Sequence, residues 1–533
     1  MSGETFRDSP ELVFGIAGAI GIDVDEIVAS LNSALSGVGY SSEAIKLTDE
    51  IAAYSPTTVA PTSADYDAKM NYKMDVGNEL CARFKDKATL ARIGVRAIRN
   101  RRRSRTGNFE LALSATAFVV RQLKRPDEVD LFRRVYGPRF FLISAYGGEA
   151  ARRDRLERQL KRSVSTRKSA ADIACIAERL MERDSVETRE PFGQNLQETF
   201  PMADVFIDGV NKVEMDRTLT RFTEALFGKT DISPSKAEYG MYAAKSAGLR
   251  SADLSRQVGA AIFSDDGELI TQGCNEAPKA FGGTYWDLEE PDHRDVKLGY
   301  DPNEIYKKEI VRDLIERFID DGLLSEKATD LGGPADIVDA ITAKAKAPGS
   351  KDGALVGAAI LDLTEYGRIV HAEMCAICDA ARLGRSIKGA TLFCTVFPCH
   401  NCTKHVLASG IKKVVYIEPY PKSKAKELHE NEIEIEAEIA GRVSYVPFLG
   451  ISPQRYRDIF QKKKRKGPDG KANAWYEGRP QPLINAAAPS YFDVEALAIS
   501  NTLLGTLQDT QADPAGDVEP DMVEHPAAGG TPA

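Results

Sequence analysis

Four residues in the second half of the chain have the side-chain types of a hydrolytic metal site. His371 and Glu373 begin one segment that favours a helix, and a Pro-Cys-His-Asn-Cys run from Pro398 begins another. An imidazole and two thiolates suit zinc, and three such ligands leave the fourth tetrahedral position open for water. Helix starts also favour the thiolate form of cysteine. We therefore predict that His371, Cys399 and Cys402 bind Zn²⁺.

Glu373 lies two residues after the first of these ligands, where a carboxylate can exchange protons with water. The pattern H-x-E followed by P-C-x-x-C is typical of zinc-dependent deaminases. In that chemistry, activated water attacks C4 of a cytosine ring near neutral pH. We predict that Glu373 is the catalytic residue: it takes the water proton, delivers it to ring N3 and later protonates the departing amine.

A four-cysteine structural site is the alternative. The pair Cys375 and Cys378 is separated from the pair Cys399 and Cys402 by 20 residues, a spacing that also fits a closed zinc site. However, Cys375 and Cys378 lie in an uninterrupted helical run, whereas zinc ribbons place such pairs on tight turns. This alternative also leaves Glu373 without a role. We interpret Cys375, Cys378 and Cys394 as small core residues.

The composition is that of a soluble globular protein. The 533 residues include 43% hydrophobic and 28% charged positions, and this length predicts two to four domains. No apolar run reaches the ~18 residues that cross a bilayer, and the start lacks the features of a signal peptide. Five of the eight cysteines fall within 375–402, which favours metal binding over disulfides. These features predict a cytoplasmic protein without a membrane partner.

The net charge of −9 is concentrated at the carboxyl end. Residues 508–533 contain six acidic residues and no Lys or Arg, which leaves −3 for the rest of the chain. A nearly neutral body gives no general signal for nucleic-acid binding. Basic runs do occur at 99–105 and 462–466. The first run indicates either a solvated basic loop or a surface for RNA or nucleotide phosphates.

Residues 1–235 alternate between apolar strand candidates and charged, helix-prone stretches such as 149–162. This alternation predicts an α/β domain with a mostly parallel sheet covered by helices. The strand candidates are 12–14, 117–120, 140–145 and 205–207.

Residues 236–507 are predicted to form a second domain, interrupted by a polar insertion at 277–353. An Asp-Gly step at Asp266 marks a hairpin at its start. The stretch 443–503 is expected to pack against this domain, and 508–533 is expected to be a disordered acidic tail. The predicted order is β-β-α-β-α-β: strands at 258–263, 268–272, 391–396 and 413–418, helices at 371–383 and 398–409, and a preceding helix at 239–248.

Several short motifs of this second domain point to one family. They are QVGAAI at 257–262, GCN at 273–275, HAE at 371–373, the run from 391 through the Pro-Cys-His-Asn-Cys segment, and GIKKVVY at 410–416. With these motifs the domain resembles the deoxycytidylate deaminase family, within the cytidine deaminase fold. The resemblance implies an α/β/α domain with a central mixed sheet, zinc between two helix starts, and a homo-oligomer. Asn275 matches a family position that contacts the nucleotide.

Four basic residues are candidates for contacts with substrate phosphates. Arg256 immediately precedes the first motif, and a guanidinium can bind a 5′-phosphate through two hydrogen bonds. Lys422, Lys424 and Lys426 follow the last strand candidate and could meet further phosphates. The alternative for each is a solvated surface side chain, which is favoured for the three lysines.

The start of the chain reads as a strand, a glycine-rich turn and a helix, with Gly15, Gly18 and Gly21 in the turn. Backbone N–H groups of such a turn bind phosphate. The segment resembles the P-loop of nucleotide kinases, and the region of Arg152 and Arg153 resembles their phosphate-contacting lid. We therefore regard these five residues as candidates for nucleotide binding.

This P-loop is degenerate. A working motif reads G-x-x-x-x-G-K-[ST], whereas alignment on Gly21 places Ile22 at the lysine and Asp23 at the magnesium-binding hydroxyl. Phosphoryl transfer depends on both missing groups. We predict a regulatory or sensing module for a nucleotide or a small RNA, with a scaffold that binds no nucleotide as the alternative.

The two domains together resemble the bacterial anti-phage deoxycytidine nucleotide deaminases. The resemblance implies conversion of dCTP or dCMP to dUTP or dUMP, which starves a replicating phage of dCTP. The alternatives are a housekeeping dCMP deaminase for thymidylate synthesis, a deaminase of single-stranded nucleic acid, and a regulatory protein with a structural zinc. The extra domain argues against the first and the absence of aromatic residues in the basic runs against the second. Glu373 argues against the third.

Overall fold

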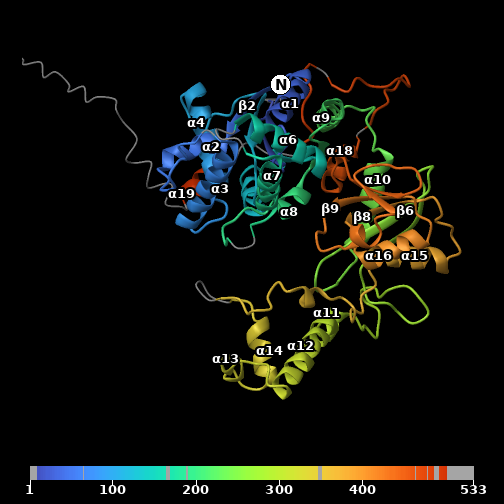
Figure 1. The fold of residues 1–533 in the computed structure, drawn as a ribbon. Helices are drawn as coiled ribbons and strands as arrows, with labels where there is room; N and C mark the ends of the chain where they lie inside the picture. Colours follow the sequence, from blue (N-terminus) through green and yellow to red (C-terminus); the bar gives the residue numbers. More distant parts are fainter. Residues whose placement is uncertain are drawn as a thin grey trace, which may run out of the picture.

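Two six-stranded sheets organise the chain, and helices cover both (Figure 1). The computed structural model describes residues 9–63, 65–163, 168–187, 190–345, 351–462, 464–476, 478–484 and 491–500. The predicted acidic tail at 508–533 lies outside these residues. None of the described helices combines the length and the apolar character that crossing a bilayer requires. The predicted α/β class is confirmed.

The first sheet has the order β12-β5-β4-β1-β3-β2. Strands β1 to β5 run parallel to one another, as predicted, and β12 (Gly450–Ile451) pairs with β5 in the antiparallel direction. Every residue of β1 is buried, which is typical of a parallel strand covered on both faces. The other strands are β2 (Ser41–Lys46), β3 (Thr116–Arg121), β4 (Phe140–Tyr146) and β5 (Val205–Asp208), with β1 at Leu12–Gly18.

Helices cover both faces of this sheet. One face packs against α1 (Val24–Gly37) and α9 (Lys212–Leu226), and the other against α4 (Thr89–Thr106) and α5 (Pro126–Tyr136). The remaining helices of this half are α2 (Leu47–Glu50), α3 (Tyr66–Arg83), α6 (Glu149–Ser163), α7 (Ala170–Ser185) and α8 (Leu196–Thr199).

The second sheet is mixed and has the order β10-β11-β9-β8-β6-β7. The hairpin of β6 and β7 is antiparallel, and β8, β9, β11 and β10 run parallel to one another. The predicted β-β-α-β-α-β order is present. The elements are β6 (Gly259–Phe263), β7 (Leu269–Cys274), α15 (Ala372–Arg382), β8 (Thr391–Val396), α16 (His400–Ala408), β9 (Lys413–Glu418), β10 (Ile433–Ile435) and β11 (Val443–Pro447), preceded by α10 (Lys236–Gly248) and accompanied by α17 (Ala425–Leu428).

Alternating side chains of β6 divide this second domain into three layers. Ala260 and Ile262 pack with Ala372 and Ala376 of α15, whereas Ala261 and Phe263 share a cluster with Met241 of α10. The sheet therefore separates α10 on one side from α15 and α16 on the other. This arrangement agrees with the predicted α/β/α domain.

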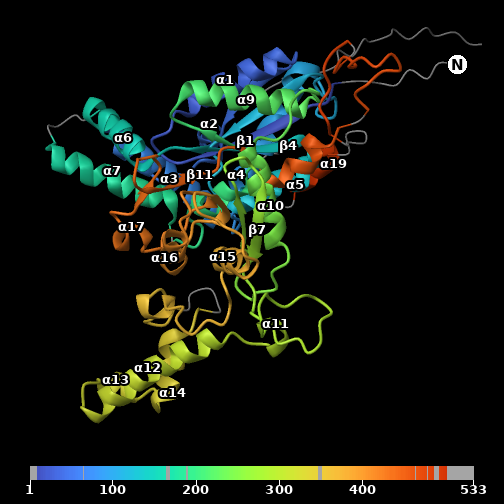
Figure 2. The same cartoon turned by 90° about the vertical axis from the view of Figure 1, so that its right-hand side faces the viewer.

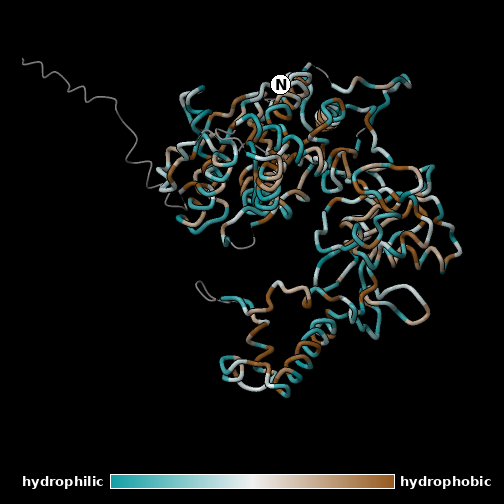
Figure 3. Tube along the Cα trace, in the orientation of Figure 1, coloured by the Kyte–Doolittle hydropathy of each residue, from teal (hydrophilic) through white to brown (hydrophobic). Residues whose placement is uncertain are grey.

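The insertion forms a helical arm that lies away from both sheets in two perpendicular views (Figures 1 and 2). It has a small core of its own, and hydrophobic stretches recur on its helices (Figure 3). An isolated bridge between Glu276 and Val370 closes its base, one residue before His371. Its helices are α11 (Asp295–Leu298), α12 (Pro302–Asp320), α13 (Glu326–Thr329) and α14 (Pro334–Thr342).

The sequence predicted that the stretch 443–503 packs against the second domain. In the structure this stretch packs against both domains. β11 does extend the second sheet, but β12 joins the first sheet, and α19 (Tyr491–Ser500) packs against α4 and α5. The anchor is Arg102 of α4, fully buried, which binds Glu11 and Glu495 at 2.9 and 2.8 Å. The short α18 (Tyr456–Phe460) lies between these segments in the chain.

Candidate metal centre

Two helix starts meet just beyond the carboxyl end of β8, an inner strand of the second sheet. His371 is the N-cap of α15 and Cys399 is the N-cap of α16, and both have extended backbone angles. The start of α15 lies very close to β7: a Cβ on Gly273 of β7 would be only 2.5 Å from the Ala372 carbonyl oxygen. Glycine at this position therefore allows the close approach that fixes the start of α15.

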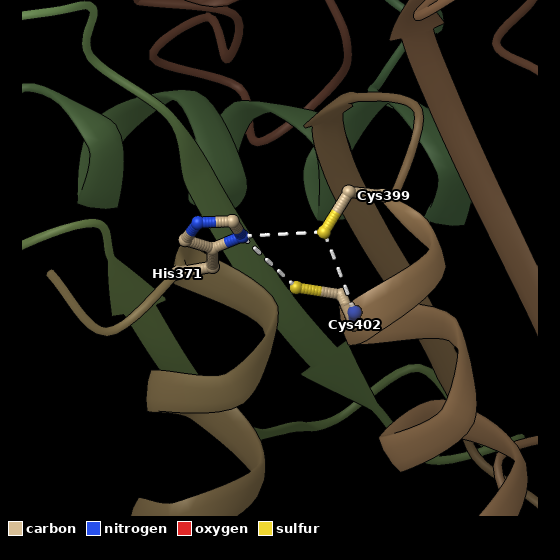
Figure 4. Close-up of side chains that lie close together, drawn as sticks. All are labelled: His371, Cys399 and Cys402. Carbon is tan, nitrogen blue, oxygen red and sulfur yellow. Dashed lines mark hydrogen bonds between the residues drawn. The ribbon is translucent and has the colours of Figure 1, made fainter. Parts of the chain in front are cut away.

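The three predicted ligands lie together (Figure 4). His371 Nδ1 is 3.4 Å from Cys399 Sγ and 3.3 Å from Cys402 Sγ, and the ligand atoms all lie within 4.8 Å of one another. Zinc with bonds of about 2.3 Å to sulfur and about 2.0 Å to nitrogen separates such atoms by about 3.5 Å in a tetrahedron. The donor set and its spacing therefore fit zinc.

Charges in the cluster favour a thiolate and a protonated imidazole when no metal is bound. The hydrogen bond from Cys402, together with that from His371, lowers the pKa of Cys399 to about 4, against the opposing effect of burial. The same thiolate raises the pKa of His371 to about 9. The pKa of Cys402 is raised by its bond to Cys399 and by burial. A divalent cation would replace these protons.

Glu373 lies in the first turn of α15 and is 4% exposed. Burial raises its pKa, and the charge of His371 opposes that rise. A carboxyl group with a raised pKa can both accept and return a proton near neutral pH. The structure therefore places Glu373 beside the ligands in an environment that suits the role predicted for it.

The structure does not favour the four-cysteine alternative, because the pair Cys375 and Cys378 does not join the cluster of His371, Cys399 and Cys402. Cys375 is buried and Cys378 is exposed on α15, and neither belongs to the metal-binding group found among the described residues. Burial raises the pKa of Cys375 to about 11, which keeps it a neutral thiol. Cys375 and Cys394 are buried, as predicted, whereas the prediction that Cys378 is a core residue is wrong, because this side chain lies on the exposed face of α15.

Asn275, at the end of β7, is fully engaged by neighbouring groups of the chain. Its Oδ1 accepts from the Val258 N–H at 2.7 Å, and its Nδ2 donates to Asp253 Oδ2 and to the Arg256 carbonyl at 2.6 and 2.7 Å. The side chain is 5% exposed. In this conformation Asn275 anchors the loop that carries Arg256.

Arg256 lies over an aromatic ring, next to the end of β9. Its guanidinium forms an ion pair with Glu418, at the end of β9, and lies 5.5 Å from the centre of the Tyr420 ring. Lys422 pairs with Asp362 at 2.5 Å. Arg256 thus stacks on Tyr420, and Lys422 follows Tyr420 by two residues in the same loop.

Lys424 lies elsewhere in the same loop. It is exposed and pairs with Glu427 at 3.2 Å, within its own helical turn, and Lys426 is exposed as well. Sequence reasoning overlooked Tyr420 and Glu418, which contact Arg256. Both residues could have been recognised from their positions: Glu418 ends β9 and Tyr420 follows it, and β9 is the parallel neighbour of β8, which leads to Cys399.

The amino-terminal turn differs from the one that the sequence indicated. Gly15 and Gly18 belong to β1, which continues to Gly18, so only Gly21 lies in the turn. Gly21 has φ +94°, and a Cβ there would lie 2.8 Å from the Arg152 carbonyl oxygen. Arg152 donates to the Gly147 carbonyl at 2.8 Å, and Arg153 pairs with Glu149 at 2.6 Å.

A carboxylate from α7 fills the position next to this turn. Asp184, 2% exposed, accepts from the Ile20 N–H at 2.7 Å and from Lys124 Nζ at 2.7 Å. Lys124 also donates to the Gly18 carbonyl at 2.7 Å. The Ile20 N–H and the Lys124 ammonium, two groups that could bind a phosphate at the turn, are therefore already bound to the Asp184 carboxylate.

The start of α1 carries a second internal carboxylate. Asp23 accepts hydrogen bonds from the N–H groups of Asp25 and Glu26, each at 3.1 Å, and forms an ion pair with Arg155 of α6. A phosphate at this helix start would meet the negative charge of Asp23. The geometry favours a self-capped helix over a phosphate site.

The basic run at 99–105 is not a loop, which is the interpretation the sequence favoured. It forms the last turns of α4, and Arg102 within it is buried in the ion pairs described above. Arg101 and Arg105 are exposed and both pair with Glu43. Helix periodicity turns one arginine of the run inwards and leaves others on the surface.

Comparisons with known proteins agree with the metal centre. The family model described as the cytidine and deoxycytidylate deaminase zinc-binding region matches residues 234–418. The deoxycytidylate deaminase of Enterobacteria phage T2 is 54% identical over 55 residues, 10% of this chain and 29% of that protein. The chain thus spans less than a third of that enzyme. The tRNA-specific adenosine deaminase of Bacillus subtilis (strain 168) is 33% identical over 108 residues, 19% of this chain and 67% of that protein.

Among solved structures, the dCMP deaminase of cyanophage S-TIM5 in complex with dCMP and dUMP is 19% identical, with a TM-score of 0.21 over 40% of this chain and 98% of that one. A score this low carries no argument about the fold. The assignment depends on the sequence matches and on the zinc-type cluster inside the matched region. Through residues 234–418, the chain belongs to the cytidine and deoxycytidylate deaminase family.

Proposed function

We propose that this chain is a zinc-dependent hydrolase that deaminates free deoxycytidine nucleotides, dCTP or dCMP, to the deoxyuridine nucleotides. The observation that carries the proposal is the convergence of His371, Cys399 and Cys402 beside a carboxyl group, Glu373, that is only 4% exposed. A purely structural metal site has no need of such a buried acid. The similarity to the deoxycytidylate deaminase of phage T2, reported above, supports the choice of substrate class.

His371, Cys399 and Cys402 are the proposed zinc ligands. Bound zinc supplies a Lewis acid that makes water nucleophilic near neutral pH. Glu373 takes a proton from the water that attacks C4 and passes it to ring N3. It then takes the proton of the new C4 hydroxyl group and passes it to the amine, so that the C4–N bond breaks and ammonia leaves as the C4 carbonyl forms. Its raised pKa favours both directions of transfer. Asn275 fixes the neighbouring loop, and Arg256 binds the 5′-phosphate in exchange for Glu418.

The wider role follows from the resemblance stated above. The enzyme lowers dCTP during infection and thereby limits phage replication; a cytoplasmic location and a homo-oligomer belong to the same proposal. The parallel order β2-β3-β1-β4-β5 supports a kinase-like amino-terminal domain. Because Asp184 and Asp23 occupy its turn, we favour a scaffold there over a nucleotide or RNA sensor.

The direct test is to incubate the purified full-length protein with dCTP, dCMP, deoxycytidine and single-stranded DNA containing deoxycytidine. Chromatography should detect deoxyuridine nucleotides and ammonia from the free nucleotides. Glu373→Gln, purified in parallel, controls for contaminating deaminases and should form no product. Conversion of the DNA alone would contradict the proposal.

The role in defence needs a cellular measurement. Nucleotide pools are compared in cells that express the wild type or Glu373→Ala, with and without phage. The expected result is a fall in dCTP on infection with the wild type alone. A fall of the same size with Glu373→Ala would show that dCTP is lost by another route.

A further inference from the structure

Besides Arg256, the proposed ligand of the 5′-phosphate, a second cation lies in the loop after β9. This cation is Lys422, and its charge is compensated by Asp362 of the insertion. Lys422 Nζ is 2.5 Å from Asp362 Oδ1. Asp362 ends the turn Ala359–Asp362, in the segment that returns from the arm to His371. The side chains of Lys422 and Asp362 are 60% and 38% exposed, so water and ligands can reach the pair.

The Lys422 pair repeats an arrangement found at Arg256. Arg256 pairs with Glu418, and its guanidinium stacks 5.5 Å from the Tyr420 ring centre. Arg256 is the less exposed of the two cations, at 44%. Its backbone carbonyl is also bound by Asn275, which ties it to the edge of the sheet. Arg256 is therefore the inner cation and Lys422 the outer one.

The loop that carries Tyr420 and Lys422 is tied to the metal centre, because Ser423 Oγ donates to the carbonyl of Pro398, the residue before Cys399, at 3.0 Å. Burial raises the pKa of Tyr420, and the charge of Cys399 raises it further. Arg256 and Lys422 lower this pKa, and Asp362 raises it. Arg256, which stacks on Tyr420, and Lys422, two residues after Tyr420, therefore both lie at the loop that is bound to the segment of Cys399.

We infer that Lys422 selects for nucleotides with more than one phosphate, and that Asp362 holds it ready when no such substrate is bound. The inference rests on the proposed function. Arg256 takes the phosphate next to the sugar, which both dCMP and dCTP carry. Lys422 meets only the outer phosphates of the longer chain.

The energetics favour this exchange of partners. An exposed ion pair adds little net stability, because water screens it, so the pair of Lys422 and Asp362 opens readily. Charge-assisted hydrogen bonds to phosphate are stronger than neutral ones, so an outer phosphate competes well for Lys422. Asp362 meanwhile repels any phosphate that approaches without engaging the lysine. The insertion thus contributes a charge that sets the preference for phosphate number.

The test measures kcat/KM of the full-length zinc-loaded protein for deoxycytidine, dCMP and dCTP. Lys422→Gln should lower kcat/KM for dCTP about tenfold, the loss of one charge-assisted hydrogen bond, and change that for dCMP less than about twofold. Asp362→Asn should raise the ratio of dCTP to dCMP several-fold, because it removes a competing negative charge.

A matched pair elsewhere in the insertion serves as the control. Lys308 and Asp339 are also exposed and lie 2.9 Å apart, on α12 and α14. Lys308→Gln and Asp339→Asn should leave the dCTP to dCMP ratio unchanged. Thermal unfolding of each variant checks that the substitutions at Lys422 and Asp362 do not act through folding.

The two hypotheses fail in different ways. If the wild type converts dCTP but Lys422→Gln lowers dCMP and dCTP turnover equally, or Asp362→Asn leaves the ratio unchanged, the inference is wrong and the proposed function stands. If the wild type converts none of the deoxycytidine compounds, the proposed function is wrong and the inference falls with it.

Discussion

The metal centre and the amino-terminal turn both lie at helix starts beside the end of a strand, yet only one has free ligand groups. At the metal centre the two capping residues, His371 and Cys399, are themselves the candidate ligands. At the amino-terminal turn, Asp23 caps α1 and Asp184 binds the Ile20 N–H. A helix start attracts anions generally. What it binds depends on whether the chain supplies its own anion.

Burial explains how the amino-terminal arrangement persists. Asp184 is 2% exposed, and Lys124 compensates its charge at 2.7 Å. A buried carboxylate with a cation and an N–H partner is stable, whereas either group alone would be strongly unfavourable. We therefore expect substitutions in this half to change stability, and substitutions at the metal centre to change metal content and catalysis.

The largest expected effect is the loss of zinc and activity in His371→Ala. Removing a ligand should cut activity by more than about hundredfold, because even partners that only orient ligands contribute 10–100-fold. Metal analysis and deaminase assays measure both effects. Cys375→Ser, a buried cysteine outside the cluster, is the control. Full zinc in His371→Ala with loss in Cys375→Ser would instead favour the four-cysteine site.

Arg102→Met should produce the largest loss of stability in the amino-terminal half. The substitution leaves Glu11 and Glu495 buried without their cation, which destabilises by about 3–5 kcal/mol. Urea unfolding measures it. Arg105→Met, an exposed neighbour paired with Glu43 at 3.5 Å, should change stability by less than about 1 kcal/mol. Equal effects of the two substitutions would argue against the buried ion pairs.

Asp184→Asn should have a smaller effect on stability and none on the zinc content of the folded protein. It removes the charge that compensates Lys124, at an expected loss of about 1–3 kcal/mol. Asp216→Asn, in an exposed pair with Lys212, controls for the loss of a surface carboxylate. If Asp184→Asn stabilised the protein instead, the carboxylate would not be a stabilising partner of Lys124 and the Ile20 N–H.

Arg153→Ala should have the smallest effect on stability. Arg153 pairs only with Glu149 at 2.6 Å in the described structure, near the surface of α6. Calorimetric titration with ATP or GTP is expected to show no binding at the turn, with or without this substitution. Nucleotide binding that Arg153→Ala weakens would restore the sensing module that the sequence suggested.

Local patterns were enough to predict much of the fold and the cluster. Strands β3, β4 and β5 coincide with short apolar runs, and the zinc-type residues follow from spacing around two helix starts. By contrast, β2 (Ser41–Lys46) was missed because it is a polar edge strand with only Ile45 buried. A strand on the sheet edge does not need the apolar pattern on which recognition depends.

The remaining features depend on contacts between distant parts of the chain. Asp184 meets Ile20 across 164 positions, and Arg102 meets Glu495 across 393. No local sequence pattern indicates a partner so far away in the chain. The sequence therefore gave no reason to distinguish Arg102 from the other residues of the basic run. Likewise, nothing near Lys422 in the sequence indicates Asp362, which arrives from the insertion.

The central claim is tested most directly by measuring zinc content and dCTP and dCMP deamination together in the wild type and Glu373→Gln. The account predicts about one zinc per chain in both proteins, and a loss of activity of about 10²–10⁴-fold in the variant, the usual contribution of a proton-transfer residue. Glu373→Gln that keeps both its zinc and its activity would contradict the account.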